Sequence, residues 1–361
     1  MSERTHWNIE LHKREDDNLL FDLQKITYPD HNIYKHENLA AQYLQWRYYS
    51  NTSIHSRIYI VKSKDGSKII GMRPISIIPI KIMGEIKKSV FFSAVITHPD
   101  YRNRGIFSSL VKYSVNASKE LGADFAFTFP NEISYPLYKR NKNWSVVSIN
   151  PIYFKIVNFK NLFFQKLIHR NYLAKDTKGN KTGISTKSRM SIKKMNFFSE
   201  EYDRLSMDES ESERVIIPRT SEYLRWRYLD NPIYRYDIYE LRGENDNLHG
   251  YIITSTQQRE GFYIGIIVDY FVKNVNGNDF HHLLNTAISE LKGNNIDILI
   301  TLIPSTFMYK NYFIRKGFMP MPRIFKSKRI NIVASIFNPI IRDHILNFRS
   351  WYITWGDTDN V

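Results

Sequence analysis

A short aromatic motif occurs twice in this chain, 180 residues apart. YLQWRY at residues 43–48 returns as YLRWRY at residues 223–228. Two flanking pairs keep a similar spacing: residues 69–71 with 248–250, and residues 130–131 with 304–305. An internal repeat whose offset drifts by a few residues indicates two copies of one fold joined in tandem. A chain of 361 residues is long enough for two domains that each bury a core.

The repeat divides the chain into three parts. Residues 1–175 contain the first copy, and residues 191–361 contain the second. Between them, residues 176–190 are polar, basic and glycine-bearing, as expected of an exposed connection. We therefore predict two domains joined by a basic linker.

Helix and strand patterns alternate along the first copy. Acidic residues suit the start of a helix at 17–26, and Leu39, Tyr43 and Trp46 share one face of a helix at 38–48. The Asp-Gly pair at 65–66 is typical of a β-hairpin turn. The predicted strands are residues 9–13, 57–61, 69–80, 89–97 and 124–129.

Composition narrows the possible functions. The net charge of +15 favours anionic partners, and the 42% of apolar residues is typical of a globular protein. The absence of cysteine excludes disulfides and thiolate nucleophiles, and the histidines, His281 and His282 included, lack the spacing of metal ligands. No apolar run approaches the roughly 18 residues of a membrane span, and the N-terminus does not resemble a signal peptide. We expect a cytoplasmic protein without a bound metal.

The segment at residues 97–111 joins the end of a predicted strand to the start of an amphipathic helix. The first amides of a helix have no intrahelical partner and carry partial positive charge, so such an end binds phosphate. Gly105 lets the backbone approach a ligand closely, and Arg102 and Arg104 add two positive charges suited to a diphosphate.

This segment resembles the CoA-binding motif of the GNAT acyltransferase superfamily, Arg/Gln-x-x-Gly-x-Gly/Ala. Arg102 and Gly105 stand at matching positions, whereas Phe107 stands where the family has glycine or alanine. The resemblance implies an α/β (α+β) fold of two tandem GNAT-like domains, each a mixed twisted sheet flanked by helices, with acyl-CoA as co-substrate. It implies CoA contacts from Val95, Ile96, Thr97, Arg102, Asn103, Arg104, Gly105, Ile106, Phe107, Ser108, Asn131 and Tyr138.

The resemblance also suggests catalytic residues. Asn131 and Tyr138 look like the family's Asn-x6-Tyr, which implies that Tyr138 protonates the departing thiolate. Ser93 lies one strand period before Val95 and is a candidate contact for the attacking amine. The last residues, 351–361, mix aromatic and acidic side chains. They form either a strand with a frayed end or a tail that returns to the cleft.

A returning tail would bring a general base to the acceptor amine. The candidates are Asp357, Asp359 and the terminal carboxylate. If no carboxylate serves, the sulfur of CoA or a chain of water molecules takes the proton instead.

The second copy lacks the basic loop. The corresponding stretch, residues 266–283, has no arginine, and Asp279 near its helix start would compete with a phosphate. We predict that this half does not bind CoA and instead walls the acceptor site or stabilises the first half. The repeated Trp46 and Trp226 are interpreted as core packing.

The substrate prediction rests on resemblance. The chain looks like tandem-GNAT N-acyltransferases of surface-polysaccharide pathways, which implies acyl transfer to a nucleotide-linked amino sugar such as the dTDP-4-amino-4,6-dideoxyglucose of anthrose biosynthesis. Two alternatives stay open: a cell-wall aminoacyl transferase that uses aminoacyl-tRNA, and a non-catalytic CoA-binding scaffold. We expect no nucleic-acid partner and no membrane span.

Overall fold

The structure is a computed structural model. It describes residues 7–51, 53–158, 190–207, 214–259, 261–273, 275–305, 307–322 and 329–358. Of the predicted linker, 176–190, only Met190 falls among these residues, and the predicted Asp359 lies outside them. Both halves mix helices with strands, which confirms the predicted fold class. Within the described residues, no helix is long and apolar enough to cross a bilayer.

The first half follows the predicted order closely. Its elements are β1 (Glu10–Leu11), α1 (Asp17–Thr27), α2 (Glu37–Tyr48), β2 (His55–Lys62), β3 (Ile69–Ile82), β4 (Glu85–Phe92), β5 (Ile96–Thr97), α3 (Ile106–Glu120), β6 (Phe125–Thr128), α4 (Tyr135–Arg140) and β7 (Ser145–Ile156). The predicted strand 89–97 differs, because the chain leaves regular pairing between β4 and β5.

The second half repeats this order. Its elements are β8 (Ser191–Met195), α6 (Glu201–Met207), α7 (Ser221–Leu224), β9 (Asp237–Arg242), β10 (Leu248–Arg259), β11 (Phe262–Val272), α8 (Gly277–Gly293), β12 (Ile298–Leu302), α9 (Lys310–Arg315), β13 (Met319–Pro320), β14 (Arg329–Ile336) and α10 (Arg342–Leu346). The helix α7 continues into a π-helical turn, Arg225–Leu229, which carries the repeated motif.

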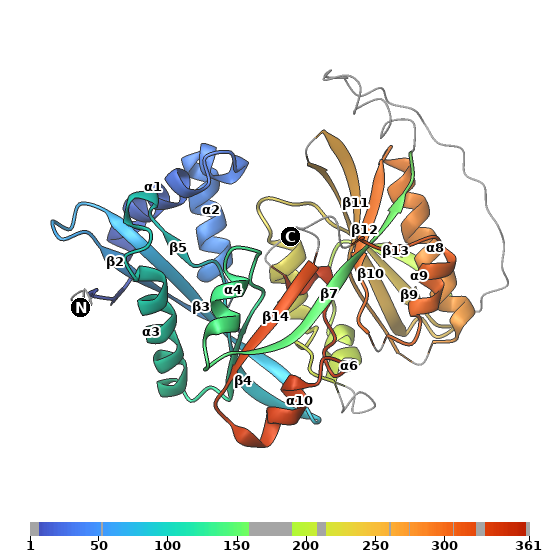
Figure 1. Cartoon of the computed structure of the whole chain (residues 1–361). Helices are drawn as coiled ribbons and strands as arrows, with labels where there is room; N and C mark the ends of the chain where they lie inside the picture. The colour runs from blue at the N-terminus through green and yellow to red at the C-terminus, as the bar shows by residue number, and fades with distance from the viewer. Residues whose placement is uncertain are drawn as a thin grey trace.

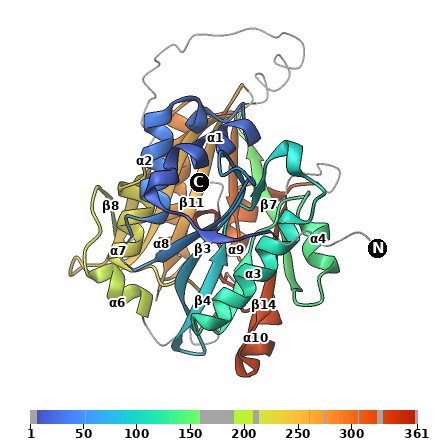
Figure 2. The same cartoon turned by 90° about the vertical axis from the view of Figure 1, so that its left-hand side faces the viewer.

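Helices cover both faces of the first half's sheet. Side chains alternate along β2, so that Ile58 and Ile60 pack with α1 and α2 while Tyr59 and Val61 pack with α3. In Figure 2, α3 lies in front of these strands and α1 and α2 lie above it. Close packing of α3 requires Gly71, since a Cβ there would stand 2.6 Å from Cγ2 of Ile106.

The two copies exchange their last strands. β6 of the first copy pairs antiparallel with β14 of the second, and β12 of the second copy pairs antiparallel with β7 of the first. β7 and β14 also pair with each other and run side by side between the halves (Figure 1). The described strands therefore form one 14-stranded sheet. Each half needs a strand of the other to complete its own part of that sheet.

The repeated tryptophans meet where the two copies join. Trp46 Nε1 donates to the carbonyl oxygen of Trp226 at 2.7 Å, and Trp226 Nε1 donates to that of Trp46 at 2.8 Å. The rings stack with centroids 5.4 Å apart, and both are buried. Such reciprocal contact between equivalent residues is what a two-fold axis produces in a symmetric dimer. The pair packs in the core, as the sequence analysis predicted.

Candidate active site

The sheet of the first half opens at one end. β6 pairs in parallel with β4 from Ser89 to Phe91, and the hydroxyl of Thr128 donates to the carbonyl oxygen of Phe92 at 2.6 Å. Beyond that point β5 pairs only with β3, and residues 93–95 lie between the two strands. The two parallel strands therefore separate at the position where the sequence predicted a continuous strand.

The basic loop leads from β5 into α3 with an uncapped helix start. Gly105 is the N-cap, with φ of 82°, and no side chain caps the first turn. A Cβ built at Gly105 would meet nothing within 4 Å, so the space above this turn is open. The free amides of a 15-residue helix thus face an open surface, which suits an anion.

Two exposed arginines flank this helix start. Neither Arg102 nor Arg104 forms an ion pair with a described residue. The guanidinium of Arg104 lies 5.0 Å from the ring centroid of Tyr101, and its carbonyl oxygen accepts the indole N–H of Trp7 at 2.9 Å. The backbone of the loop is therefore tied down while both charges stay available. Asn103 and Ser108 are also exposed.

A cavity of about 210 Å³ lies between α3 and α4. Its lining residues are Phe107, Ser108, Val111, Leu137, Tyr138, Arg140 and Asn141. Phe107, the departure from the family motif, packs edge-on against Tyr138 with centroids 5.9 Å apart. Its side chain forms a wall of the cavity and leaves its backbone amide at the start of α3.

Tyr138 is buried at the inner end of this cavity. Its hydroxyl oxygen accepts a hydrogen bond of 2.7 Å from Nη2 of Arg73, and its ring packs against Trp144. Because the oxygen already accepts from Arg73, the phenolic proton remains free to be donated elsewhere. Sequence reasoning missed Arg73, although a single arginine within an apolar strand was a signal that it is special.

The other predicted site residues differ in whether the side chain or only the backbone can reach a ligand. Ser93 is buried, with Oγ 3.4 Å from the hydroxyl of Tyr48 and its carbonyl oxygen accepting from Nη1 of Arg73 at 3.1 Å. The side chains of Ile96 and Ile106 are buried in the core, so only their backbone can reach a ligand. Val95 and Thr97 are half-buried at the strand break.

Asn131 has a local structural role. Its Oδ1 accepts hydrogen bonds from the backbone N–H of Ser134 and Ile133, at 2.9 and 3.1 Å, just before α4. The side chain therefore turns into its own loop.

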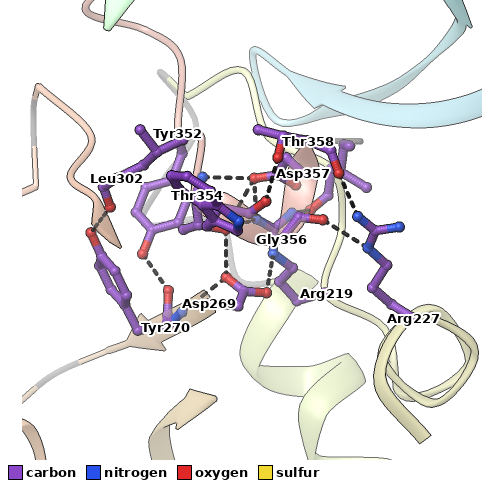
Figure 3. A network of polar contacts seen from close by, with 12 residues as sticks. Arg219, Arg227, Asp269, Tyr270, Leu302, Tyr352, Thr354, Gly356, Asp357 and Thr358 are labelled. Carbon is purple, nitrogen blue, oxygen red and sulfur yellow. Dashed lines mark hydrogen bonds and ion pairs between the residues drawn. The ribbon is translucent and has the colours of Figure 1, made fainter. Parts of the chain in front are cut away.

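The C-terminal segment lies where the two halves meet, beside Arg219 and Arg227 (Figure 3). We call this region the seam. Residues Trp351 to Thr358 are buried there. Asp357 Oδ2 accepts from Nη2 of Arg219 at 2.7 Å and from the backbone N–H of Thr354 at 2.8 Å. Oδ1 of the same carboxylate has no hydrogen-bond partner among the described residues, although Asp357 is only 7% exposed.

Asp357 borders a second, smaller cavity. It encloses about 20 Å³ and is lined from both halves, by Phe91 and Phe127 on one side and by Trp226 and Arg227 on the other. This volume holds about one water molecule. Phe91 lies one strand period from Ser93, so the cavity adjoins the opening of the sheet on the face away from α3.

Arg219 lies between two buried carboxylates at this seam (Figure 3). It pairs with Asp269 at 3.1 Å and with Asp357 at 2.7 Å. Burial raises the pKa of Asp269, against the pull of Arg219. Although burial opposes its charge, the two carboxylates hold the pKa of Arg219 well above its usual value. The network fixes Asp357 in place while one of its oxygens stays unbonded.

The corresponding helix start in the second half is occupied. The side chain of Asn276 accepts from the amides of Asn278 and Asp279 at the start of α8, both at 2.9 Å. The hydroxyl of Tyr312 lies where a Cβ of Gly277 would stand. This geometry favours the prediction that only the first half binds CoA. Asp279 is itself buried, and the described residues contain no cluster of three or more potential metal ligands.

Comparison with known proteins agrees with this geometry. Residues 13–147 match the acetyltransferase (GNAT) domain family. The matched segment contains the strand break, the loop at Gly105 and Tyr138. Among curated proteins, none matches the chain by sequence.

Solved structures extend the fold likeness over nearly the whole chain. A GCN5-related N-acetyltransferase from Anabaena variabilis has a TM-score of 0.61 at 12% identity, over 91% of this chain and 72% of that one. The N-myristoyltransferase of Saccharomyces cerevisiae with bound myristoyl-CoA has a TM-score of 0.59 at 12% identity, over 93% and 85%. A tandem GNAT protein from the clavulanic acid biosynthesis pathway has a TM-score of 0.55 at 11% identity, over 91% and 98%. The fold is thus that of tandem GNAT proteins.

The open helix start can be tested with a matched pair of glycines. Gly105→Glu places a carboxylate at the amides of α3, so CoA affinity is expected to fall about 10-fold to 100-fold, the loss of one or two charge-assisted hydrogen bonds. Gly66→Glu is the control, because Gly66 also has positive φ and open space but lies in the β2–β3 hairpin. Isothermal titration with CoA measures both. Equal affinity of the two variants would contradict an anion site at Gly105.

Proposed function

We propose that this protein transfers an acyl group from acyl-CoA to an amine. The GNAT domain match and the N-acyltransferase neighbours support an acyl-CoA-dependent N-acyltransferase. The single observation that carries the proposal is the uncapped, open start of α3 behind Gly105. It lies beside the opening between β4 and β6 and beside the buried Tyr138. An acyl-CoA needs all three features: an anion site for its diphosphate, a strand edge for its arm and a proton donor for its sulfur.

On the donor side, the diphosphate of CoA binds the first amides of α3, with Arg102 and Arg104 neutralising its charge. The pantetheine arm follows the free edge of β5, at Val95 and Thr97. The thioester carbonyl then lies at the strand break, where backbone N–H groups stabilise the oxyanion of the tetrahedral intermediate. Tyr138 donates its proton to the sulfur as the C–S bond breaks.

On the acceptor side, the amine enters from the seam between the two halves. Its nitrogen attacks the thioester carbon, and the unbonded Oδ1 of Asp357 accepts the proton that the nitrogen loses. Ser93 contacts the amine from the end of β4. Asp359 and the terminal carboxylate remain the other candidate bases. The small seam cavity has to widen to admit an acceptor larger than water.

A second part of the proposal names the class of acceptor. We keep the amine of a nucleotide-linked amino sugar, such as dTDP-4-amino-4,6-dideoxyglucose, as the proposed substrate class in surface-polysaccharide synthesis, and a cytoplasmic location with it. The net charge of +15 supports two diphosphate-bearing substrates. A screen of acyl-CoA donors against amino-sugar nucleotides, read by release of free thiol, tests this directly. Transfer from aminoacyl-tRNA with no dependence on CoA would contradict it.

The role of Tyr138 has a control within the chain. Tyr138→Phe removes the proton donor, so kcat is expected to fall by about 10²-fold or more while KM for acyl-CoA changes little. The repeat-related Tyr312→Phe removes the same hydroxyl from the second half and should leave kcat unchanged. Steady-state kinetics at several acyl-CoA concentrations measure both effects. An equal loss in both variants would contradict an acid role for Tyr138.

The role of Asp357 is tested by an isosteric change. Asp357→Asn keeps the shape of the side chain but removes the basic oxygen, so kcat is expected to fall by about 10²-fold to 10⁴-fold. Arg219 keeps Asp269 as its partner, which preserves the fold. Asp343→Asn, on the exposed first turn of α10, is the control. An Asp357→Asn variant with wild-type kcat would show that another group takes the proton.

A further inference from the structure

Arg73 is a buried cation at the opening of the sheet. It projects from β3 and is 1% exposed. Nη1 donates to the carbonyl oxygen of Ser93 at 3.1 Å, and Nη2 donates to the hydroxyl oxygen of Tyr138 at 2.7 Å. Its guanidinium carbon lies 4.5 Å from the ring centroid of Phe92, and Nε has no hydrogen-bond partner among the described residues.

The charge of Arg73 is not balanced by a carboxylate. No described acidic side chain forms an ion pair with it, and burial lowers its pKa against the influence of Tyr138. Burial of an unpaired charge is costly, so buried arginines normally pair with acids. Arg219 in the same chain does so with Asp269 and Asp357. The first half therefore keeps an unneutralised positive charge beside its tyrosine.

The second copy shows that the fold does not require this charge. Gly71 and Gly250 correspond in the repeat, and Ile252 then stands at the position of Arg73. Ile252 is fully buried in β10, so an apolar side chain fills the same place. The cation is present only in the half whose helix start is open.

We propose that Arg73 is a positioning residue that acts through Tyr138: it stabilises the phenolate that Tyr138 becomes when the thioester breaks. This inference rests on the proposed acyltransferase function. Because Arg73 donates to the phenolic oxygen, the O–H of Tyr138 is directed away from it, toward the leaving sulfur.

The proton balance explains why the charge has no carboxylate partner. The amine nitrogen bonds to the thioester carbon and loses a proton to Asp357, the C–S bond breaks with its electron pair on sulfur, and the proton of Tyr138 passes to that sulfur. The phenolate left behind lies 2.7 Å from the guanidinium and regains a proton from solvent. The buried charge is thus neutralised only as the reaction proceeds, and interactions that strengthen along the reaction accelerate it. A carboxylate paired with Arg73 would neutralise the guanidinium before the reaction, so the gain on forming the phenolate would be lost.

The test is a double-mutant cycle on the full chain. Arg73→Met is expected to lower kcat about 10-fold to 100-fold, with KM for acyl-CoA within about twofold. In the Tyr138→Phe background the same change is expected to cost no further kcat, because the group through which Arg73 acts is gone. Arg73→Lys keeps a cation and should recover most of the lost rate.

A stability measurement separates this role from a structural one. Arg73→Met leaves no acid unpaired, so Tm should stay near the wild-type value. Arg242→Met is the matched control in the second half: it leaves the buried carboxylate of Glu240, which is 1% exposed, without its ion-pair partner, so Tm should fall while kcat is kept.

The outcomes separate the inference from the function on which it rests. A wild-type protein that transfers no acyl group would overturn the proposed function and this inference with it. An active wild type in which Arg73→Met keeps its kcat, or loses the same factor with and without Tyr138, would overturn the inference alone. A loss of kcat in Arg73→Met that is accompanied by a fall in Tm would also overturn the inference alone.

Discussion

The parallel pairing of β4 with β6 stops after Phe91 and Phe127, and the candidate active site depends on that stop. Where the strands part, the first half gains an unpaired backbone edge, and Tyr138 and its partner Arg73 lie on the α3 side of the sheet. The exchange of β7 and β14 then holds the second half against the other face. In the proposed mechanism, the acyl donor and the amine therefore approach from opposite sides.

The two copies keep one scaffold and differ in its chemistry. In the first copy Thr128 donates to the carbonyl oxygen of Phe92, and in the second Thr301 donates to that of Ile267. The tyrosines of the repeated motif also keep their places, with Tyr48 beside Ser93 and Tyr228 donating to Asp269.

The two copies differ in the charged side chains at equivalent points of the sheet and of the helix start. The second copy has an acid, Asp269, just beyond the end of the parallel β11–β12 pairing, a capped helix start and a buried isoleucine where the first copy has Arg73. Its Asp269 instead anchors Arg219, which in turn anchors the C-terminal segment at the seam. One copy has the proposed anion site, and the other holds the C-terminal segment in place.

The sequence was informative wherever a local pattern sets the structure. The helices near residues 17–26 and 38–48 and the glycine turn before α3 follow from short-range periodicity and backbone preference, and the repeat is visible as a matching motif 180 residues apart. The break in the predicted strand 89–97 did not, because it depends on how β4 and β5 pair with β3 and with β6, which a local pattern does not show. The strand exchange was hidden for the same reason.

Single side chains were harder to predict. The family motif singled out Tyr138 as a candidate, whereas Arg73 stands out only in the fold, which buries it without an ion pair to a described acid. Asn131 fits the same motif, yet its side chain turns into its own loop before α4, since its oxygen accepts from the amides of Ile133 and Ser134. A motif predicts which residues occur together, and the direction of each side chain depends on its packing.

The central claim is that the first half alone holds the diphosphate of CoA, on the amides that begin α3. Hydrogen exchange of the full chain with and without CoA measures those amides directly. We expect slower exchange at residues 105–109 on adding CoA and no change at residues 276–280. Protection at the second helix start, or none at the first, would contradict it.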